Sequence, residues 1–360
     1  PVSAETIGGE QLASPHRTVA LQPGAKPLPD VWAETWILAD LTTGEVLAQK
    51  GSHVVRKPAS TLKMLTALTV LPNTNPADTY VATKRAAGIY GARVGLKPGR
   101  SYTLDQLWYA VFLPSANDAA IAVAEANGGV RKTVRQMQRT AQELGALDTV
   151  VRNTNGLDAP GQVSSAYDLA LIGRAGLARE DFATYAGATK ATFPNVKGKG
   201  SHPIYTTNRL LLHGFDGMIG VKTGFTSKAG RTYVGAATRK GRTLIVALMG
   251  IHEASETAAR KLLKWGFQNG DKVTPIGQLV EPDDIAATAG SGTAVGTSAV
   301  ATATEANDPA DTSTQAGAAP DQSSASPIGI VLIVVVIGAV LLLIVTTRRR
   351  RRPRGRHAAA

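Results

Sequence analysis

The chain contains no cysteine among its 360 residues. This absence excludes disulfide bonds, thiolate metal sites and a cysteine nucleophile. It fits an exported bacterial protein that does without disulfides, although cytosolic proteins can also lack cysteine. The chain begins at Pro1 rather than at methionine, so we expect a trimmed N-terminus and a cleaved signal peptide that lies outside this sequence.

Several other chemical signatures are missing as well. No Gly-x-Ser-x-Gly elbow suggests a Ser-His-Asp hydrolase, and no glycine-rich phosphate loop is present. The six histidines have no metal-ligand spacing and are interpreted as structural or surface residues. We therefore expect no metal and no cofactor.

The positive charge is concentrated at the C-terminal end. The formal net charge is +12, but the stretch "RRRRRPRGRH" at 348–357 holds seven arginines, which leaves 12 − 7 = +5 for the rest. The net positive charge thus comes partly from the C-terminal arginines, and it is weak evidence for nucleic-acid binding. We expect no nucleic-acid partner, although a nucleic-acid role for the arginines stays open as an alternative.

The sequence directly before these arginines is a long apolar run. Residues 328–345 contain no charged side chain and, as a helix, would rise about 27 Å, close to the thickness of a bilayer core. Extended by two threonines, 328–347 is predicted to be a single transmembrane helix in the lipid bilayer; a buried core element is the alternative. Because flanking arginines stay on the cytoplasmic side, the tail at 348–360 should be cytoplasmic and the preceding domain extracellular.

The remaining sequence divides into three parts. Residues 1–29 are expected to form an extended N-terminal segment and 30–272 a globular domain. Residues 273–327 are predicted to be a disordered linker, because its Ala/Thr/Ser-rich section at 287–327 has almost no large apolar residues and cannot build a core.

Strand patterns occur at both ends of the globular region. Residues 35–50 are predicted to form a hairpin around "TTGE", and residues 232–250 a second hairpin around "RKGR". Helical patterns lie between them at 133–146 and after them at 256–267. We therefore predict an α/β (α+β) fold, with an antiparallel sheet made from both ends of the domain, flanking helices and a mostly helical subdomain.

Three short motifs carry groups suited to catalysis. In "PASTLKMLTALTVL", Ser60 and Lys63 are spaced to share a helical face, so a neutral lysine could activate the serine. Ser115 and Asn117 follow a proline at a loop-to-helix junction, where they could shuttle a proton and hold a substrate carbonyl. Alternatively, Ser60, Ser115 or Asn117 is a helix cap and Lys63 a surface charge.

The third motif is Lys222-Thr223-Gly224, at the start of an apparent strand. The lysine charge and threonine hydroxyl suit a carboxylate, and the glycine would let a substrate backbone approach an edge strand. A structural loop or hairpin before the strand is the alternative.

Each motif is weak alone, but the ordered set resembles the penicillin-binding protein and serine β-lactamase superfamily. The stretches "KPASTLKMLTAL", "LPSANDAAIAVAE", "NTNGLDAPGQVSSAYDLA" and "GVKTGFTSKAGRTYVGAA" are similar to D-alanyl-D-alanine carboxypeptidases of low molecular mass. The resemblance runs from about residue 30 to 267. It implies a β-lactamase/transpeptidase-like fold and a substrate that is a peptidoglycan stem peptide, with β-lactams as inhibitors.

The resemblance also implies roles for individual residues. Ser60 would attack the carbonyl between the two D-alanines, Lys63 would accept its proton, and Ser115 would relay a proton to the leaving amine. The substrate would be bound by Asn117, Lys222, Thr223, Gly224, Phe225 and Arg209, with the backbone N–H groups of Ser60 and Phe225 forming an oxyanion hole.

Two rival functions remain open from the sequence. A class A β-lactamase needs a glutamate-activated water after the second motif, but no glutamate occurs between Glu143 and Glu180. We therefore expect β-lactams to act as slow-leaving inhibitors. A non-catalytic wall-binding or sensor module is the other rival, although all the motif residues are present.

Overall fold

The structure is a computed structural model that describes residues 6–195, 197 and 199–281. No helix within these ranges is long and apolar enough to cross a membrane. The predicted span at 328–347, the basic tail and most of the predicted linker lie outside the described residues.

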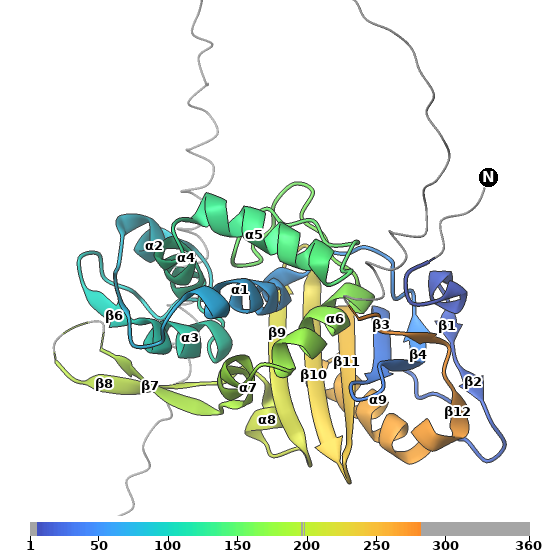
Figure 1. Ribbon diagram of the computed structural model, residues 1–360. Helices are drawn as coiled ribbons and strands as arrows, with labels where there is room; N and C mark the ends of the chain where they lie inside the picture. The colour runs from blue at the N-terminus through green and yellow to red at the C-terminus, as the bar shows by residue number, and fades with distance from the viewer. Residues whose placement is uncertain (1–5, 196, 198, 282–360) are drawn as a thin grey trace, which may run out of the picture. The chain divides into compact units, whose positions relative to one another are not determined.

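The described residues are organised around one antiparallel sheet with the order β1-β4-β3-β11-β10-β9, and β13 pairs with β4 (Figure 1). Its strands are β1 (Arg17–Thr18), β3 (Ala33–Asp40), β4 (Glu45–Lys50), β9 (Met218–Thr226), β10 (Gly230–Arg239), β11 (Arg242–Ile251) and β13 (Gly277–Gln278). Three two-stranded sheets add β2 (Ala20–Leu21) with β12 (Val273–Thr274), β5 (Thr79–Val81) with β6 (Ser101–Thr103), and β7 (Lys190–Pro194) with β8 (Ser201–Tyr205).

The main sheet joins the two ends of the domain, as the sequence predicts. Both predicted hairpins form, as β3–β4 and as β10–β11. The two hairpins meet where β11 pairs with β3, with Ile245 opposite Ala39 and Ala247 opposite Ile37. In the spatial order of the strands, β9 is the last and lies beside β10. The Lys222 motif therefore lies on a strand at the edge of the sheet.

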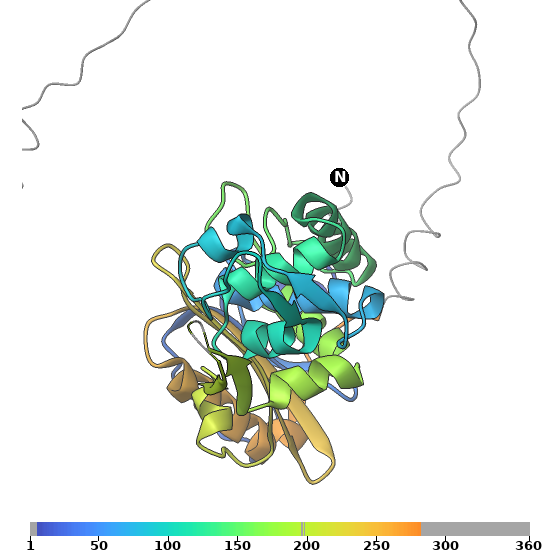
Figure 2. The same ribbon diagram turned by 90° about the vertical axis from the view of Figure 1, so that its left-hand side faces the viewer.

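The helices are η1 (Glu10–Ala13), η2 (Ala59–Leu62), α1 (Lys63–Val70), η3 (Leu71–Asn73), α2 (Lys84–Gly88), α3 (Leu104–Phe112), α4 (Asn117–Ala126), α5 (Val130–Glu143), α6 (Ala166–Leu177), α7 (Glu180–Gly187), α8 (Arg209–Leu212), α9 (Ser255–Asn269) and η4 (Gly270–Lys272). The predicted helices at 133–146 and 256–267 correspond to α5 and α9. Figure 2 views the molecule from the side on which α2, α3 and α4 lie in Figure 1.

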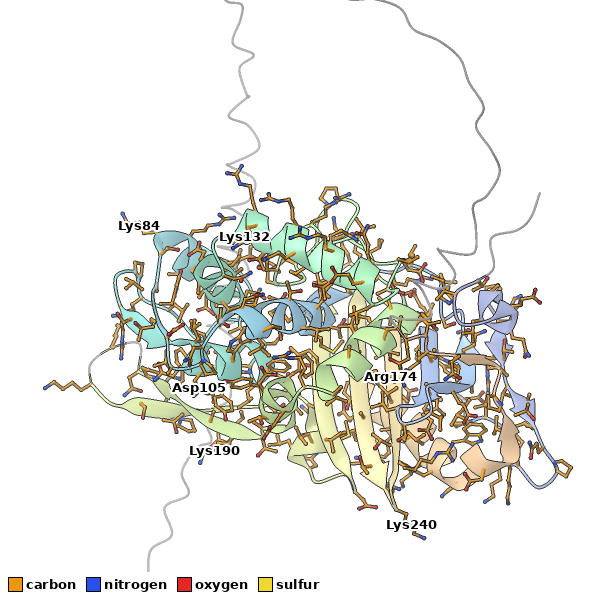
Figure 3. All side chains as sticks on the ribbon, in the orientation of Figure 1. Lys84, Asp105, Lys132, Arg174, Lys190 and Lys240 are labelled. Atoms are coloured by element: carbon orange, nitrogen blue, oxygen red, sulfur yellow. The ribbon has the colours of Figure 1, made fainter. Side chains whose placement is uncertain are left out.

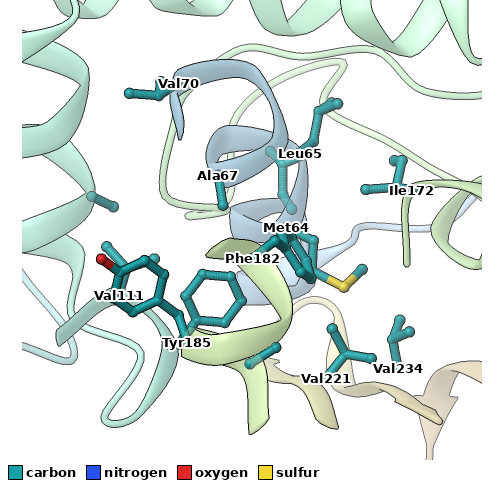
Figure 4. Packing of buried hydrophobic residues seen from close by; sticks show 14 of the residues in the cluster. Met64, Leu65, Ala67, Val70, Val111, Ile172, Phe182, Tyr185, Val221 and Val234 are labelled. Carbon is teal, nitrogen blue, oxygen red and sulfur yellow. The ribbon is translucent and has the colours of Figure 1, made fainter. Parts of the chain in front are cut away.

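The sheet has a hydrophobic core on each of its two faces, because successive residues of a strand point to opposite faces. Leu244, Val246 and Leu248 of β11 pack with α9. Ile245 and Ala247, between them, join the larger core with α1 and α6. Figure 4 shows part of this larger core around α1, to which Met64, Leu65, Ile172 and Phe182 contribute. Charged side chains such as those of Lys84, Lys132 and Lys240 project outward (Figure 3).

The folded domain extends beyond the boundaries that we predict at residues 30 and 272. On the C-terminal side, β12 pairs with β2, β13 pairs with β4, and Ile276 and Leu279 are buried. Residues 273–281 therefore belong to the domain and not to the linker. On the N-terminal side, β1 pairs with β4, β2 pairs with β12, and Leu12 of η1 is fully buried.

Candidate active site

Ser60 lies in the short 3₁₀ turn η2, directly before α1. The preceding residue, Ala59, has a positive φ of 50°, a sparsely populated conformation for a residue with a Cβ atom. No side chain caps η2 or α1. The Ser60 hydroxyl instead accepts a hydrogen bond from Lys63 Nζ at 2.8 Å, so the alternative that Ser60 is a helix cap is wrong.

Lys63 is fully buried, which excludes the alternative of a solvated surface charge. Besides Ser60, its amine donates to Asn117 Oδ1 at 2.7 Å and to the backbone carbonyl of Asn155 at 2.6 Å. Burial and then the charge of Lys222 hold the pKa of Lys63 well below its usual value, and Asp118 opposes them. A lysine in this environment loses its proton more readily than a solvated lysine, and its neutral amine can accept one from a hydroxyl.

Ser115 lies just before α4 and Asn117 is the first residue of that helix, next to the Ser60–Lys63 pair. Ser115 has a positive φ of 61°, and its buried Oγ has no hydrogen-bond partner within the described residues. Such strain and an unpaired hydroxyl are typical of functional positions. Asn117 connects Lys63 to the carbonyl of Tyr90, to which its Nδ2 donates at 2.9 Å. Neither Ser115 nor Asn117 caps α4, because its N-cap residue Ala116 has no side-chain cap.

Lys222 and Thr223 lie inside β9 and not at its beginning. The Lys222 side chain is buried, and its Nζ donates to the carbonyl of Thr223 at 2.9 Å. Burial lowers the pKa of Lys222 to about 7. The Thr223 hydroxyl lies 2.7 Å from that of Thr207. Together these groups offer an ammonium and two hydroxyls to an anion.

Gly224 allows β9 to pack closely against η2, the turn that carries Ser60. A Cβ atom at this position would lie 2.4 Å from Thr232 Oγ1 and 2.8 Å from the backbone nitrogen of Ser60. Thr232 also donates to the carbonyl of Pro58 at 2.8 Å. The lack of a side chain at Gly224 therefore leaves room for the backbone of η2. The approach of a substrate backbone to this strand stays a prediction. The next residue, Phe225, is 65% exposed.

These segments line one cleft of about 510 Å³. Arg209 lies on its wall at the start of α8, where its Nη1 is 3.8 Å from Oε1 of Glu256. The lining includes Ser60, Gly91, Ala92, Pro114, Ser115, Thr207, Arg209, Thr223, Gly224, Phe225, Arg231, Tyr233, Ser255 and Glu256. Lys63, Asn117 and Lys222 lie behind this lining. Lys63 and Lys222 contact it through their hydrogen bonds to Ser60 and Thr223, and Asn117 through its backbone N–H, which donates to the Ala92 carbonyl at 2.7 Å.

The sequence reasoning assigned no role to two other parts of the site. The first is the carbonyl of Asn155, which accepts from Lys63. The loop that carries it can approach because Gly156 has a positive φ, and a Cβ atom there would lie 1.9 Å from the Ala59 carbonyl oxygen. A backbone carbonyl has no sequence signature, so only the glycine could have pointed to this contact.

The second is the buried carboxylate of Asp118, which accepts from the backbone N–H groups of Val94, Gly95 and Leu96. It fixes the loop that contributes Gly91 and Ala92 to the cleft. Its position directly after the Ser-x-Asn motif was the available signal.

Several known proteins are similar to this chain in sequence. The D-alanyl-D-alanine carboxypeptidase DacB2 of Mycobacterium tuberculosis is 41% identical over 251 residues, which cover 68% of this chain and 85% of that protein. The carboxypeptidase DacD of Escherichia coli is 34% identical over 67% of this chain but only 64% of its own length. The chain therefore spans less than two thirds of the latter relative.

The Streptomyces K15 DD-transpeptidase has a similar structure, with a TM-score of 0.64 and 27% identity over 68% of this chain and 100% of that one. This fold and the chemistry of the cleft define a serine peptidase of the penicillin-binding class. A family model described as D-alanyl-D-alanine carboxypeptidase matches residues 22–253, so the chain belongs to the peptidase S11 family of D-alanyl-D-alanine carboxypeptidases.

Proposed function

We propose that this enzyme removes the terminal D-alanine from peptidoglycan stem pentapeptides through an acyl-enzyme on Ser60. The observation that carries the proposal is the hydrogen bond from the buried Lys63 amine to the Ser60 hydroxyl. In its neutral form the amine accepts the serine proton as Oγ attacks the carbonyl between the two D-alanines. The ester forms, the peptide bond breaks, and water later hydrolyses the ester to release the shortened peptide.

Ser115 and Asn117 act on the same step from the other wall of the cleft. The unpaired Ser115 hydroxyl relays a proton to the nitrogen of the leaving D-alanine. Asn117 keeps its Oδ1 on Lys63 and orients the substrate carbonyl. The backbone N–H groups of Ser60 and Phe225 stabilise the developing oxyanion, and the close approach of Gly224 to η2 supports this pairing.

The terminal carboxylate of the substrate is bound at Lys222 and Thr223. A buried ammonium beside hydroxyl groups favours an anion through charge-assisted hydrogen bonds. This requirement selects a chain end over an internal peptide bond. Arg209 assists from the outer wall of the cleft, where its pairing with Glu256 is long and its side chain is exposed.

β-Lactams acylate the same serine and leave slowly. The segment between Glu143 and Glu180 contains no glutamate to activate a hydrolytic water. Asp158, an acidic residue of this segment near β9, is engaged by the Thr226 hydroxyl at 3.0 Å. These observations favour a carboxypeptidase over a class A β-lactamase.

The membrane assignment is a separate proposal that is supported by the sequence alone. The apolar run 328–347 and the arginines after it favour a single transmembrane helix with a cytoplasmic tail and an extracellular catalytic domain. The domain would then face the cell wall, where its substrate is assembled.

Release of D-alanine from a pentapeptide tests the enzymatic proposal. The wild-type enzyme should produce the tetrapeptide and free D-alanine, and Ser60→Ala should produce neither. A fluorescent penicillin should label the wild type stoichiometrically. Labelling without release of D-alanine would favour the non-catalytic wall-binding module.

A further inference from the structure

The cleft carries a second arginine to which the mechanism assigns no role. Arg231 lines the same cleft as Ser60, and its side chain is exposed. Arg209 has Glu256 near it, but within the described part of the chain the Arg231 guanidinium makes no ion pair. In the proposed mechanism the terminal carboxylate is already bound by Lys222 with assistance from Arg209. Arg231 is thus a surplus cation in a cleft that binds anions.

Arg231 has a defined position along the substrate. In the register between β9 and β10, Tyr233 lies opposite Thr223 and Arg231 lies opposite Phe225. Two residues along a strand span about 7 Å. With the terminal carboxylate at Thr223 and the nucleophile beside Gly224, the level of Arg231 corresponds to the acyl side of the bond that is cleaved.

Arg231 is held there by an aromatic ring. Its guanidinium carbon lies 6.0 Å from the ring centroid of Phe225, within cation–π range. Phe225 lines the same cleft and is 65% exposed, so its ring is accessible to a substrate side chain. The pair presents an apolar surface next to a guanidinium. This combination fits an aliphatic side chain that ends in a carboxylate.

We propose that Arg231 is a specificity-determining residue that binds a second carboxylate, carried by the side chain of the residue before the D-alanyl-D-alanine unit. The inference rests on the proposed function. Phe225 orients the guanidinium and packs against the aliphatic part of that side chain. The enzyme then prefers stem peptides with an acidic third residue over those in which the same group is amidated.

Two peptides test this assignment. Both end in D-alanyl-D-alanine, preceded in one by 2-aminoadipic acid and in the other by its side-chain carboxamide. Release of D-alanine gives kcat/KM for the wild type, Arg231→Gln, Arg231→Lys and the matched surface control Arg135→Gln on α5. Stoichiometric penicillin labelling verifies that each variant is folded.

The wild type should prefer the acidic peptide by about tenfold, the typical effect of one charge-assisted contact. Arg231→Gln should lose this preference, Arg231→Lys should retain part of it, and Arg135→Gln should keep it fully. An equal preference in the wild type and Arg231→Gln overturns the assignment. It is also overturned if the substitution slows both peptides equally, because Arg231 would then serve the terminal carboxylate. Absence of D-alanine release from either peptide overturns the proposed function, and this inference with it.

Discussion

The Lys63 amine lies 2.8 Å from the Ser60 hydroxyl and is itself completely buried. Burial and the neighbouring Lys222 both favour the neutral amine, so this contact joins a nucleophile to a base that needs no histidine. Asn117 and the carbonyl of Asn155 accept the remaining N–H groups of the ammonium form. The amine is therefore held in one orientation in either protonation state.

Replacing Lys63 by arginine should abolish turnover although the positive charge is kept. A guanidinium stays protonated in proteins and cannot accept the serine proton. We expect kcat/KM on a pentapeptide to fall by about a thousandfold, within the range of general-base effects. Thermal unfolding should verify that the variant folds. Turnover close to the wild-type rate would show that another group is the base.

The activity should have a bell-shaped dependence on pH. On the acid side kcat/KM falls when Lys63 becomes protonated, and on the alkaline side when Lys222 loses its charge, at about pH 7 in the free enzyme. A Lys222→Gln variant should be slower and should lack the alkaline limb. A wild-type kcat/KM that keeps rising well above pH 7 would contradict the assignment of the carboxylate to Lys222.

The same lowered pKa makes a prediction about stability. The pKa of Lys222 in the folded state lies below the unfolded value of 10.5, so folding releases a proton between about pH 7 and 10.5. This group therefore destabilises the fold at low pH, and its contribution becomes more favourable as the pH rises through that window. Lys222→Met should raise the free energy of unfolding at neutral pH by about 1 kcal/mol while removing activity. If urea unfolding gave Lys222→Met a lower free energy of unfolding than the wild type, this prediction would be wrong.

Adding one methyl group at Gly224 should disrupt the site. In Gly224→Ala the new Cβ atom would lie 2.8 Å from the Ser60 nitrogen, which forces β9 and η2 apart. Since misplacement by about 1 Å can cost a hundredfold, we expect a comparable loss in the rate of penicillin acylation. Gly88→Ala is the matched control, because a Cβ atom there meets nothing within 4 Å. Equal acylation rates in both variants would show that this approach is unimportant.

The proposed topology predicts where proteases can act. In cells whose wall has been removed, added protease should cut between residues 287 and 327 and release a soluble, active fragment. A chain that lacks 328–347 serves as the control and should be released without protease. Complete protection of the catalytic domain would mean that the orientation is reversed.

The sequence predicts the sheet and the motif residues because both rest on side-chain patterns. The hairpins at β3–β4 and β10–β11 combine apolar strands with turn residues, and both form. The strands after residue 272 have two residues each, too few for a recognisable alternation. Their place in the domain depends instead on the burial of Ile276 and Leu279, which is a tertiary property.

The geometry of the site was less predictable than its composition. The positive φ of Ser115 and the contact from Lys63 to the Asn155 carbonyl depend on backbone conformation, which these residue types do not specify. The contact between Gly224 and η2 could not be predicted for the same reason. The lack of a side chain at Gly224 shows that something approaches closely but does not show what approaches.

Mass spectrometry of the reaction products in water labelled with a heavy oxygen isotope tests the central claim most directly. With a stem pentapeptide, the wild-type enzyme should yield unlabelled D-alanine and a tetrapeptide with one heavy oxygen in its new carboxylate, because water hydrolyses the acyl-enzyme. Ser60→Ala should yield neither product. Labelled tetrapeptide from Ser60→Ala at the wild-type rate, or no D-alanine from the wild type, would contradict the account.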